Sequence, residues 1–208
     1  MRYAATLAFA FCLAAPAGAA ELDLTLRTSA GKAVADAVVM VRPDAAQRGV
    51  ARVAGPFVMA QKNTQFSPHV LIVPVGAEVS FPNLDPFHHH VYSFSKAKTF
   101  ELKLYGKDET RKVRFDKAGV IGIGCNIHDN MSAWIRVVDA PFAAKTAASG
   151  QAVVRELPPG PATVTVWSAT LKAPDGEIVR RVTIPASGAL KLALVGDLKP
   201  QRLRRDGY

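Results

Sequence analysis

Short segments in which apolar and polar residues alternate dominate the chain, and Gly or Pro separates one segment from the next. This period-two pattern places successive side chains on opposite faces of a strand, and no segment shows the spacing of a convincing amphipathic helix. Many short strands separated by turn residues favour a β-sandwich or barrel. We expect strands at residues 22–28, 37–43, 69–76, 77–83, 90–95, 112–119, 120–125, 133–139, 162–169 and 189–196.

The N-terminus has the three-part composition of a secretory signal peptide. Arg2 precedes an apolar run over residues 4–15, and small residues follow at positions 17–19. The run is too short to span a bilayer comfortably, and no later segment reaches the roughly 18 apolar residues of a transmembrane helix. We therefore expect residues 1–20 to be removed and the remaining 188 of the 208 residues to be exported to the periplasm.

The charge of the chain bears on its partners. The full sequence has a formal net charge of +9, and the leader contains Arg2 and no acidic residue, so the mature protein carries +8. Such basicity favours acidic partners or anionic surfaces. No ribonucleoprotein-type motif accompanies it, and nucleic acid is a poor candidate for an exported protein. Residues 199–208 are expected to form a solvated basic tail.

Without the leader the chain has one cysteine, Cys125, in the stretch GCNIHDNM of residues 124–131. Exported proteins normally pair their cysteines, so this thiol is either a small buried core residue or a residue with chemistry of its own. His128 and Met131 follow it at intervals of three. The question is whether these three side chains share one task.

The pattern before the cysteine predicts where its side chain points. Alternation places Ile121, Ile123 and Cys125 on one face of a strand, and the turn-forming residues at 126, 129 and 130 predict a loop before the next strand. A thiolate, an imidazole and a thioether on one such loop suit copper, because the blue-copper site uses two His, one Cys and a weak axial Met. Zinc seldom uses Met, so a zinc site is disfavoured.

The second histidine of such a site has to come from another strand. The stretch FPNLDPFHHHVYSFS, residues 81–95, contains His88, His89 and His90. Period-two geometry allows His89 to face one side of a strand while the other two face the opposite side, and the flanking residues do not decide which side is inward. The residues themselves leave this choice open. We interpret His69 as a structural residue.

The central block, residues 56–139, resembles a cupredoxin. CNIHDNM has the Cys-x-x-His-x-x-Met spacing of amicyanin, and cupredoxins commonly carry the upstream ligand in a His-Asn-Val frame. His89-His90-Val91 fits that frame with His in place of Asn. The resemblance implies a copper site with four ligands: His89, Cys125, His128 and Met131.

The whole arrangement is similar to bacterial exported proteins called methylamine utilization or plastocyanin-like proteins. The flanking stretches LDLTLRTSAGKAVADAVVMVRP and ASGQAVVRELPPGPATVTVW resemble carboxypeptidase-regulatory or transthyretin-like domains. This resemblance implies an all-β chain in which a Greek-key cupredoxin β-sandwich is inserted in or adjacent to a second small β-sandwich, residues 21–55 and 140–198. One larger sandwich or two sequential domains are the alternatives.

Electron transfer is the function that these features favour. Four protein ligands leave copper no open position for a substrate, and no acidic residue is placed to orient a Cys-His catalytic pair, so we do not expect an enzyme. The resemblance implies a redox partner such as a dehydrogenase or a cytochrome. We expect an apolar docking patch of Phe87, Met131 and Trp134 around His128. A periplasmic copper carrier, or a partner-binding sandwich with an accessory copper site, remains as an alternative function.

Overall fold

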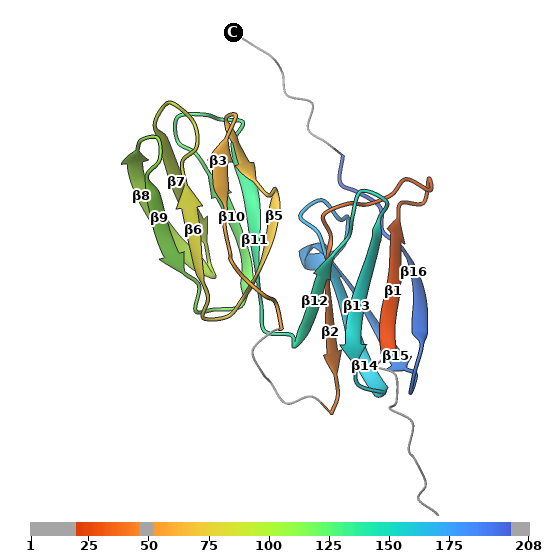
Figure 1. Ribbon diagram of the computed structural model, residues 1–208. Helices are drawn as coiled ribbons and strands as arrows, with labels where there is room; N and C mark the ends of the chain where they lie inside the picture. The colour runs from red at the N-terminus through yellow and green to blue at the C-terminus, as the bar shows by residue number, and fades with distance from the viewer. Residues whose placement is uncertain (1–19, 46–51, 201–208) are drawn as a thin grey trace, which may run out of the picture.

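Two groups of β-strands lie side by side in the computed structural model, which describes residues 20–45 and 52–200 (Figure 1). The predicted leader, apart from Ala20, and residues 201–208 of the basic tail lie outside the described residues. The all-β prediction is confirmed, because the one helical element within these ranges is the short 3-10 turn η1 (Pro174–Gly176). No helix in the described ranges has the length and apolarity needed to cross a membrane.

The first group, here called the copper sandwich because it contains the four predicted copper ligands, uses the strands from residue 60 to residue 138. Its five-stranded sheet has the order β5-β11-β10-β7-β8, and the pairs β6–β9 and β3–β4 form the opposite layer. The strands are β3 (Ala60–Lys62), β4 (Gln65–Ser67), β5 (Val70–Pro74), β6 (Glu78–Pro82), β7 (His89–Ser95), β8 (Lys98–Tyr105), β9 (Thr110–Arg114), β10 (Gly119–Gly124) and β11 (Ser132–Val138).

Both layers of the copper sandwich bury one face in a common core. Phe81 of the small layer and Val91, Ile121 and Ile135 of the large sheet are fully buried and belong to one apolar cluster. Cys125 lies in the same cluster. The predicted strand alternation therefore holds up to the cysteine, whose side chain points into this core.

The second sandwich combines strands that precede and follow the copper sandwich in the chain. A three-stranded sheet, β13-β1-β16, packs on a four-stranded sheet, β12-β2-β14-β15, around a core of Leu, Val and Ala side chains. Its strands are β1 (Ala20–Arg27), β2 (Val38–Pro43), β12 (Phe142–Lys145), β13 (Gln151–Leu157), β14 (Gly160–Trp167), β15 (Glu177–Ile184) and β16 (Ala189–Val195).

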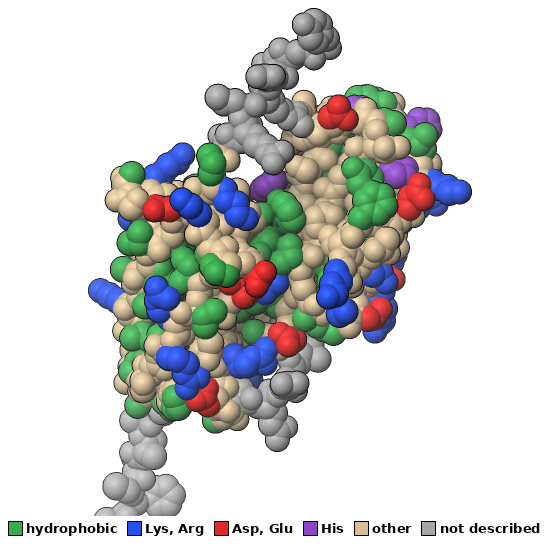
Figure 2. Space-filling model, turned by 180° about the vertical axis from the view of Figure 1, so that it is seen from behind, with side chains coloured by type: hydrophobic (Ala, Val, Ile, Leu, Met, Phe, Trp, Pro, Cys, Tyr) green, Lys and Arg blue, Asp and Glu red, His purple; other side chains and the backbone are tan. Residues whose placement is uncertain are grey.

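An apolar interface joins the two sandwiches, and hydrophobic side chains gather along this boundary in Figure 2. The rings of Trp134 on β11 and Trp167 on β14 meet edge to face, with centroids 6.2 Å apart. Beside them Arg136 donates a hydrogen bond of 2.7 Å to Glu177, and both side chains are largely buried. Burial lowers the pKa of Arg136, and the carboxylate of Glu177 opposes that shift.

Several strand predictions need correction. The strand expected at residues 112–119 ends at Arg114, and its last expected residue, Gly119, begins the next strand, β10. The strand expected at 69–76 ends at Pro74, since Gly76 adopts a positive φ of 88°. Six strands had not been predicted, and β8 and β15 are the longest of them. β8 has period-two alternation of apolar and polar residues and could have been predicted, whereas the consecutive Arg180 and Arg181 interrupt the alternation in β15.

Candidate metal centre

The segment GCNIHDNM forms a tight loop between paired strands. Strands β10 and β11 pair as far as Gly124 and Ser132, so residues 125–131 close the end of the hairpin. The loop is held by a hydrogen bond from Cys125 N to Met131 O at 3.3 Å and by one from Met131 N to His128 O at 2.9 Å. The backbone itself thus brings the three predicted donor residues to one end of the sandwich.

His89 reaches the same place from the neighbouring strand β7, which pairs with β10 at Tyr92 and Gly124. The pairing of β7 with β8 shifts register between His89 and Val91. The extra residue lies in β8, so β7 keeps its alternation: His89 and Val91 face inward, and His90 lies on the opposite face. Periodicity alone could not settle which histidine faces inward, because apolar residues flank both faces of β7 and only the pairing of β7 with β10 decides which face meets the core.

The structure brings His89, Cys125 and His128 together, with one donor atom from each within 4.8 Å of the others. Cys125 Sγ lies 3.6 Å from His128 Nδ1 and 3.9 Å from His89 Nδ1. A trigonal site with metal–sulfur and metal–nitrogen bonds of about 2.3 and 2.0 Å separates sulfur and nitrogen by about 3.7 Å. The three donors therefore fit a single metal ion, and their soft and borderline chemistry supports the prediction of copper.

Exposure differs among the four predicted ligands. His89, Cys125 and Met131 are 0%, 4% and 1% exposed, whereas His128 is half-buried. Met131 lies in the same apolar cluster as Cys125, but its role as an axial ligand stays a prediction. A metal held here would be shielded from water on three sides, with His128 nearest to solvent.

The other histidines lie outside the cluster. His88 and His69 are exposed, and the backbone carbonyl of His69 accepts a hydrogen bond from Trp134 N. His90 turns away from the cysteine and pairs with Glu101 on β8, with 2.8 Å between Nε2 and the carboxylate. The histidine in the position of the expected Asn therefore forms a contact on the flank of the sandwich, beside the ring of Tyr92.

The expected docking patch is wrong for two of its three residues. Met131 is buried, and Trp134 pairs with Gly122 and packs on the second sandwich. Phe87 is 41% exposed, and its ring lies 5.5 Å from that of His128. Leu84 and Ile127, which are 47% and 50% exposed, are apolar surface residues on the two loops that carry the predicted ligands.

Sequence reasoning missed Asp85, which is buried four residues before His89. His89 Nε2 lies 2.8 Å from its carboxylate, which can only accept from it, and Nδ1 is the ring nitrogen that faces the sulfur. Burial alone would raise the pKa of Asp85, but hydrogen bonds from Thr64, His89 and Asn63 outweigh it and hold the pKa below its ordinary value. A buried carboxylate cannot be read from a stretch such as NLDPF, because acidic residues in loops are mostly exposed.

A polar network fixes the loop that carries Asp85. Asn83 is fully buried and donates hydrogen bonds to the carbonyls of Phe87 and Tyr105 at 2.8 and 3.0 Å. Burial raises the pKa of Tyr105 to about 12, so its phenol stays protonated and donates to Phe81 O at 3.0 Å. Gln61 donates to the phenol oxygen from the facing layer.

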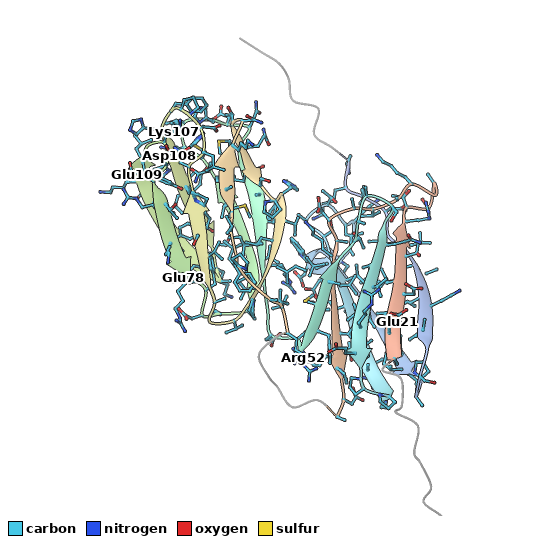
Figure 3. All side chains as sticks on the ribbon, in the orientation of Figure 1. Glu21, Arg52, Glu78, Lys107, Asp108 and Glu109 are labelled. Atoms are coloured by element: carbon cyan, nitrogen blue, oxygen red, sulfur yellow. The ribbon has the colours of Figure 1, made fainter. Side chains whose placement is uncertain are left out.

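The turn between β8 and β9 supports the same loop. Asp108 N donates to Asn83 O at 2.8 Å, and Asn83 N donates to Glu109 O at 2.9 Å. Figure 3 shows Lys107, Asp108 and Glu109 together at this end of the copper sandwich. The rim beyond the metal-binding cluster is therefore charged, whereas its immediate surroundings are apolar.

Comparisons with solved structures find copper proteins that match part of this chain. A Cu-containing nitrite reductase from Thermus scotoductus SA-01 is 28% identical over 47% of this chain and 25% of that chain, with a TM-score of 0.39. A purple cupredoxin from Nitrosopumilus maritimus is 20% identical over 40% of this chain and 100% of that chain, with a TM-score of 0.37. Amicyanin from Paracoccus versutus is 16% identical over 48% of this chain and 98% of that chain, also with a TM-score of 0.37.

The matched part spans a quarter of the length of the nitrite reductase. No protein-family model matches the chain, and no curated protein matches it. The chemistry of the site therefore rests on its own geometry.

Proposed function

We propose that the protein is a type 1 copper protein that carries single electrons between redox partners. The observation that carries this proposal is the cluster of His89, Cys125 and His128, whose three donor atoms lie within 4.8 Å of one another. A copper ion bound there would supply one-electron chemistry by cycling between Cu(I) and Cu(II). The residues of the chain supply the rest of the function.

These residues hold a preset ligand geometry and exclude water from it. The loop hydrogen bonds between Cys125, His128 and Met131 fix one side of the site, and the hydrogen bond of His89 to Asp85 fixes the other. Met131 would add a fourth donor to the three clustered residues, and four protein donors would leave no position for a substrate, which favours an electron carrier over an enzyme. Electrons would enter and leave through His128, the most exposed of the three clustered residues.

The cellular setting belongs to the same proposal. The leader of residues 1–20 supports export to the periplasm, and the basic mature chain supports an acidic docking face on the partner, which is a dehydrogenase or a cytochrome. The resemblance to methylamine utilization proteins supports a protein of that exported type. We further propose that the second sandwich is of the carboxypeptidase-regulatory or transthyretin-like type.

A copper carrier is the second candidate, and the exposed His88 next to the buried His89 favours it. This side chain offers an imidazole at the surface from which copper could pass inward. His90 does not add to such a path, because it pairs with Glu101 on the flank.

The optical spectrum of the Cu(II)-loaded protein tests the proposal. An intense thiolate-to-copper charge-transfer band, with a reversible one-electron wave and no loss of copper to a chelator, supports electron transfer. Weak d–d absorption alone contradicts the type 1 assignment. A coloured protein that passes its copper readily to a chelator supports the carrier instead. Reduction rates with cationic and anionic donors, measured at increasing salt, test the electrostatic part of the proposal.

A further inference from the structure

Asp85 is the one acidic side chain that is buried among the described residues, with 4% exposure. A buried carboxylate without partners is strongly unfavourable, so a fold retains one only where hydrogen bonds satisfy it. Its environment therefore indicates what it does. That environment consists of His89 on one side and the tip of a small hairpin on the other.

The hairpin of β3 and β4 meets the carboxylate through its turn. Asn63 N donates to Asp85 Oδ1 at 2.6 Å, and Thr64 N donates to Oδ2 at 3.0 Å. Both turn residues are left-handed, with φ values of 55° and 57°. Asn tolerates this conformation, but it is strained for a β-branched residue such as Thr. The turn accepts this strain while it presents two consecutive N–H groups to the carboxylate.

The hydrogen bonds indicate the charge of the Asp85 carboxylate and the direction of its hydrogen bond with His89. Backbone N–H groups can only donate, so the carboxylate accepts from Asn63 and Thr64 and accepts a third bond from His89 Nε2 at 2.8 Å. The side chain of Asn83 also holds the backbone of Asp85 in place, because Asn83 Oδ1 accepts a hydrogen bond of 2.9 Å from Asp85 N. A flip of the imidazole that turned Nδ1 away from Cys125 would also take Nε2 away from Asp85 and break this bond.

We propose that Asp85, held by the β3–β4 turn, is a positioning residue that fixes the tautomer of His89 and lowers the reduction potential of the bound copper. The proposal rests on the proposed copper function. A negative charge one imidazole away from the metal raises the basicity of the ligand and favours the more positive oxidised ion. The small hairpin then has a defined task, which is to keep this charge inside the protein.

The chain contains a matched control for this pair. His90 and Glu101 are also a histidine and a carboxylate 2.8 Å apart, one residue further along β7. The side chain of Glu101 is 59% exposed, and that of Asp85 is 5% exposed. Solvent screens the exposed pair, and His90 does not belong to the metal-binding cluster. The two pairs therefore differ in burial and in their connection to the metal.

The first experiment measures the tautomer in the metal-free, unsubstituted protein by ¹⁵N NMR of the histidine side chains. His89 is expected to carry its proton on Nε2, with slow solvent exchange. A proton on Nδ1, or rapid exchange of the Nε2 proton, would overturn the proposal. This result does not depend on copper, so it separates failure of the positioning role from failure of the proposed function.

The second experiment compares the midpoint potentials of Asp85→Asn and Glu101→Gln. Loss of such a partner typically weakens metal binding by about 10–100-fold. If a tenfold loss falls on Cu(II) alone, the midpoint potential rises by about 59 mV, since this is the one-electron equivalent of a factor of ten. Asp85→Asn is expected to show this rise and to keep the charge-transfer band, whereas Glu101→Gln leaves the potential near that of the parent.

An equal shift in both variants, or none in Asp85→Asn, contradicts the proposal. Thr64→Gly serves as the control for the turn, because it keeps the N–H donor and removes the strained φ. It should retain the parent potential. If Asp85→Asn does not fold, the NMR experiment on the unsubstituted protein still decides whether Asp85 fixes the tautomer of His89.

Discussion

The two sandwiches have similar layers but differ in what they bury. Six of the eight buried polar side chains of the described residues lie in the copper sandwich: Gln61, Asn83, Asp85, His89, His90 and Ser93. The second sandwich and its connections bury only Thr146 and Ser168. Each buried polar group needs a partner, so an apolar core is the simpler solution where packing alone is required. The difference indicates that the buried polar groups of the copper sandwich serve the candidate metal site rather than packing alone.

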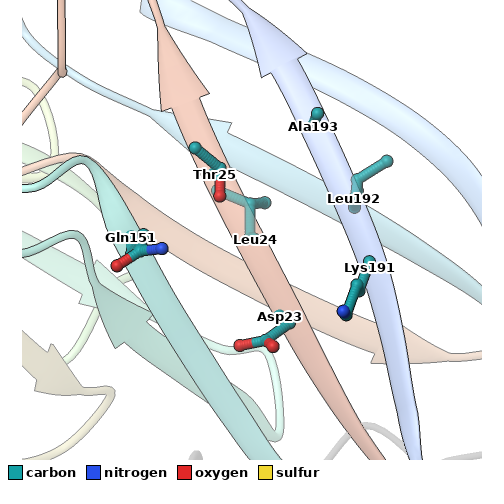
Figure 4. A pocket seen from close by; sticks show the side chains of 7 residues that line it. All are labelled: Asp23, Leu24, Thr25, Gln151, Lys191, Leu192 and Ala193. Atoms are coloured by element: carbon teal, nitrogen blue, oxygen red, sulfur yellow. The ribbon is translucent and has the colours of Figure 1, made fainter.

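The surfaces of the two sandwiches also differ in the side chains that could bind a metal. A depression of about 320 Å³ on the sheet β13-β1-β16 is lined by Asp23, Leu24, Thr25, Gln151, Lys191, Leu192 and Ala193 (Figure 4). These residues include no imidazole and no sulfur. The second sandwich therefore provides no comparable donor set there, and its clearest structural role is the apolar interface around Trp134 and Trp167. Substitutions in the two sandwiches can therefore show whether the copper site and the stability of the fold depend on different sandwiches.

The largest effect is expected for Cys125→Ser. A hydroxyl is a far harder ligand than a thiolate, so the charge-transfer band should disappear completely. Ser93→Ala removes a different buried polar group from the same sandwich and is the control, with the band expected to persist. A blue or green Cys125→Ser protein would show that the thiolate is not a ligand.

The histidine triplet should divide into three grades of effect. His89→Ala is expected to abolish the strong band, because its Nδ1 faces the sulfur at 3.9 Å. His90→Ala should shift the band slightly through loss of the contact with Glu101, and His88→Ala should leave it intact. Optical and electron paramagnetic resonance spectra measure all three. Loss of the site in His90→Ala alone would mean that the ligand register is wrong by one residue.

Shortening one buried side chain in each core tests whether the stability of the protein and the copper site can be changed independently. Leu24→Ala in the second sandwich and Ile121→Ala in the copper sandwich each remove a fully buried side chain and should cost about 2–5 kcal/mol of unfolding free energy. Only Ile121→Ala should also alter the copper spectrum, because it lies on the strand that leads to Cys125. Val195→Ala, at a residue 64% exposed, should change stability by less than about 0.5 kcal/mol. If the copper spectrum changed equally in both core variants, the prediction that only the copper sandwich supports the site would be wrong.

The smallest effect is expected for Met131→Leu. A thioether forms a weak axial bond that favours Cu(II), so its loss should raise the midpoint potential while copper and colour remain. Leucine has a similar volume, and the packing of this buried position should suffer little. Voltammetry of the two proteins measures the shift. Complete loss of copper would show that Met131 contributes more than a weak axial bond.

The residues of one short loop could be predicted because their contacts are local. Alternation through Ile121 and Ile123 determined that Cys125 points inward, and the spacing to His128 and Met131 determined that all three share the turn between β10 and β11. The strand pattern also determined the all-β class, since a period of two residues is a property of each segment by itself. β8 follows this pattern although it had not been predicted, whereas the consecutive Arg180 and Arg181 of β15 interrupt it.

Only the tertiary structure decided which histidine joins the cysteine and what holds it there. His89 faces the sulfur because β7 lies beside β10 with this face toward the core, and no segment carries that information alone. Asp85 becomes a buried ion because the turn at Asn63 and Thr64, about 20 residues earlier in the chain, supplies the donors that make its burial tolerable. Burial and hydrogen bonding depend on which strands meet, whereas the sequence determines directly only what lies within one strand or one turn.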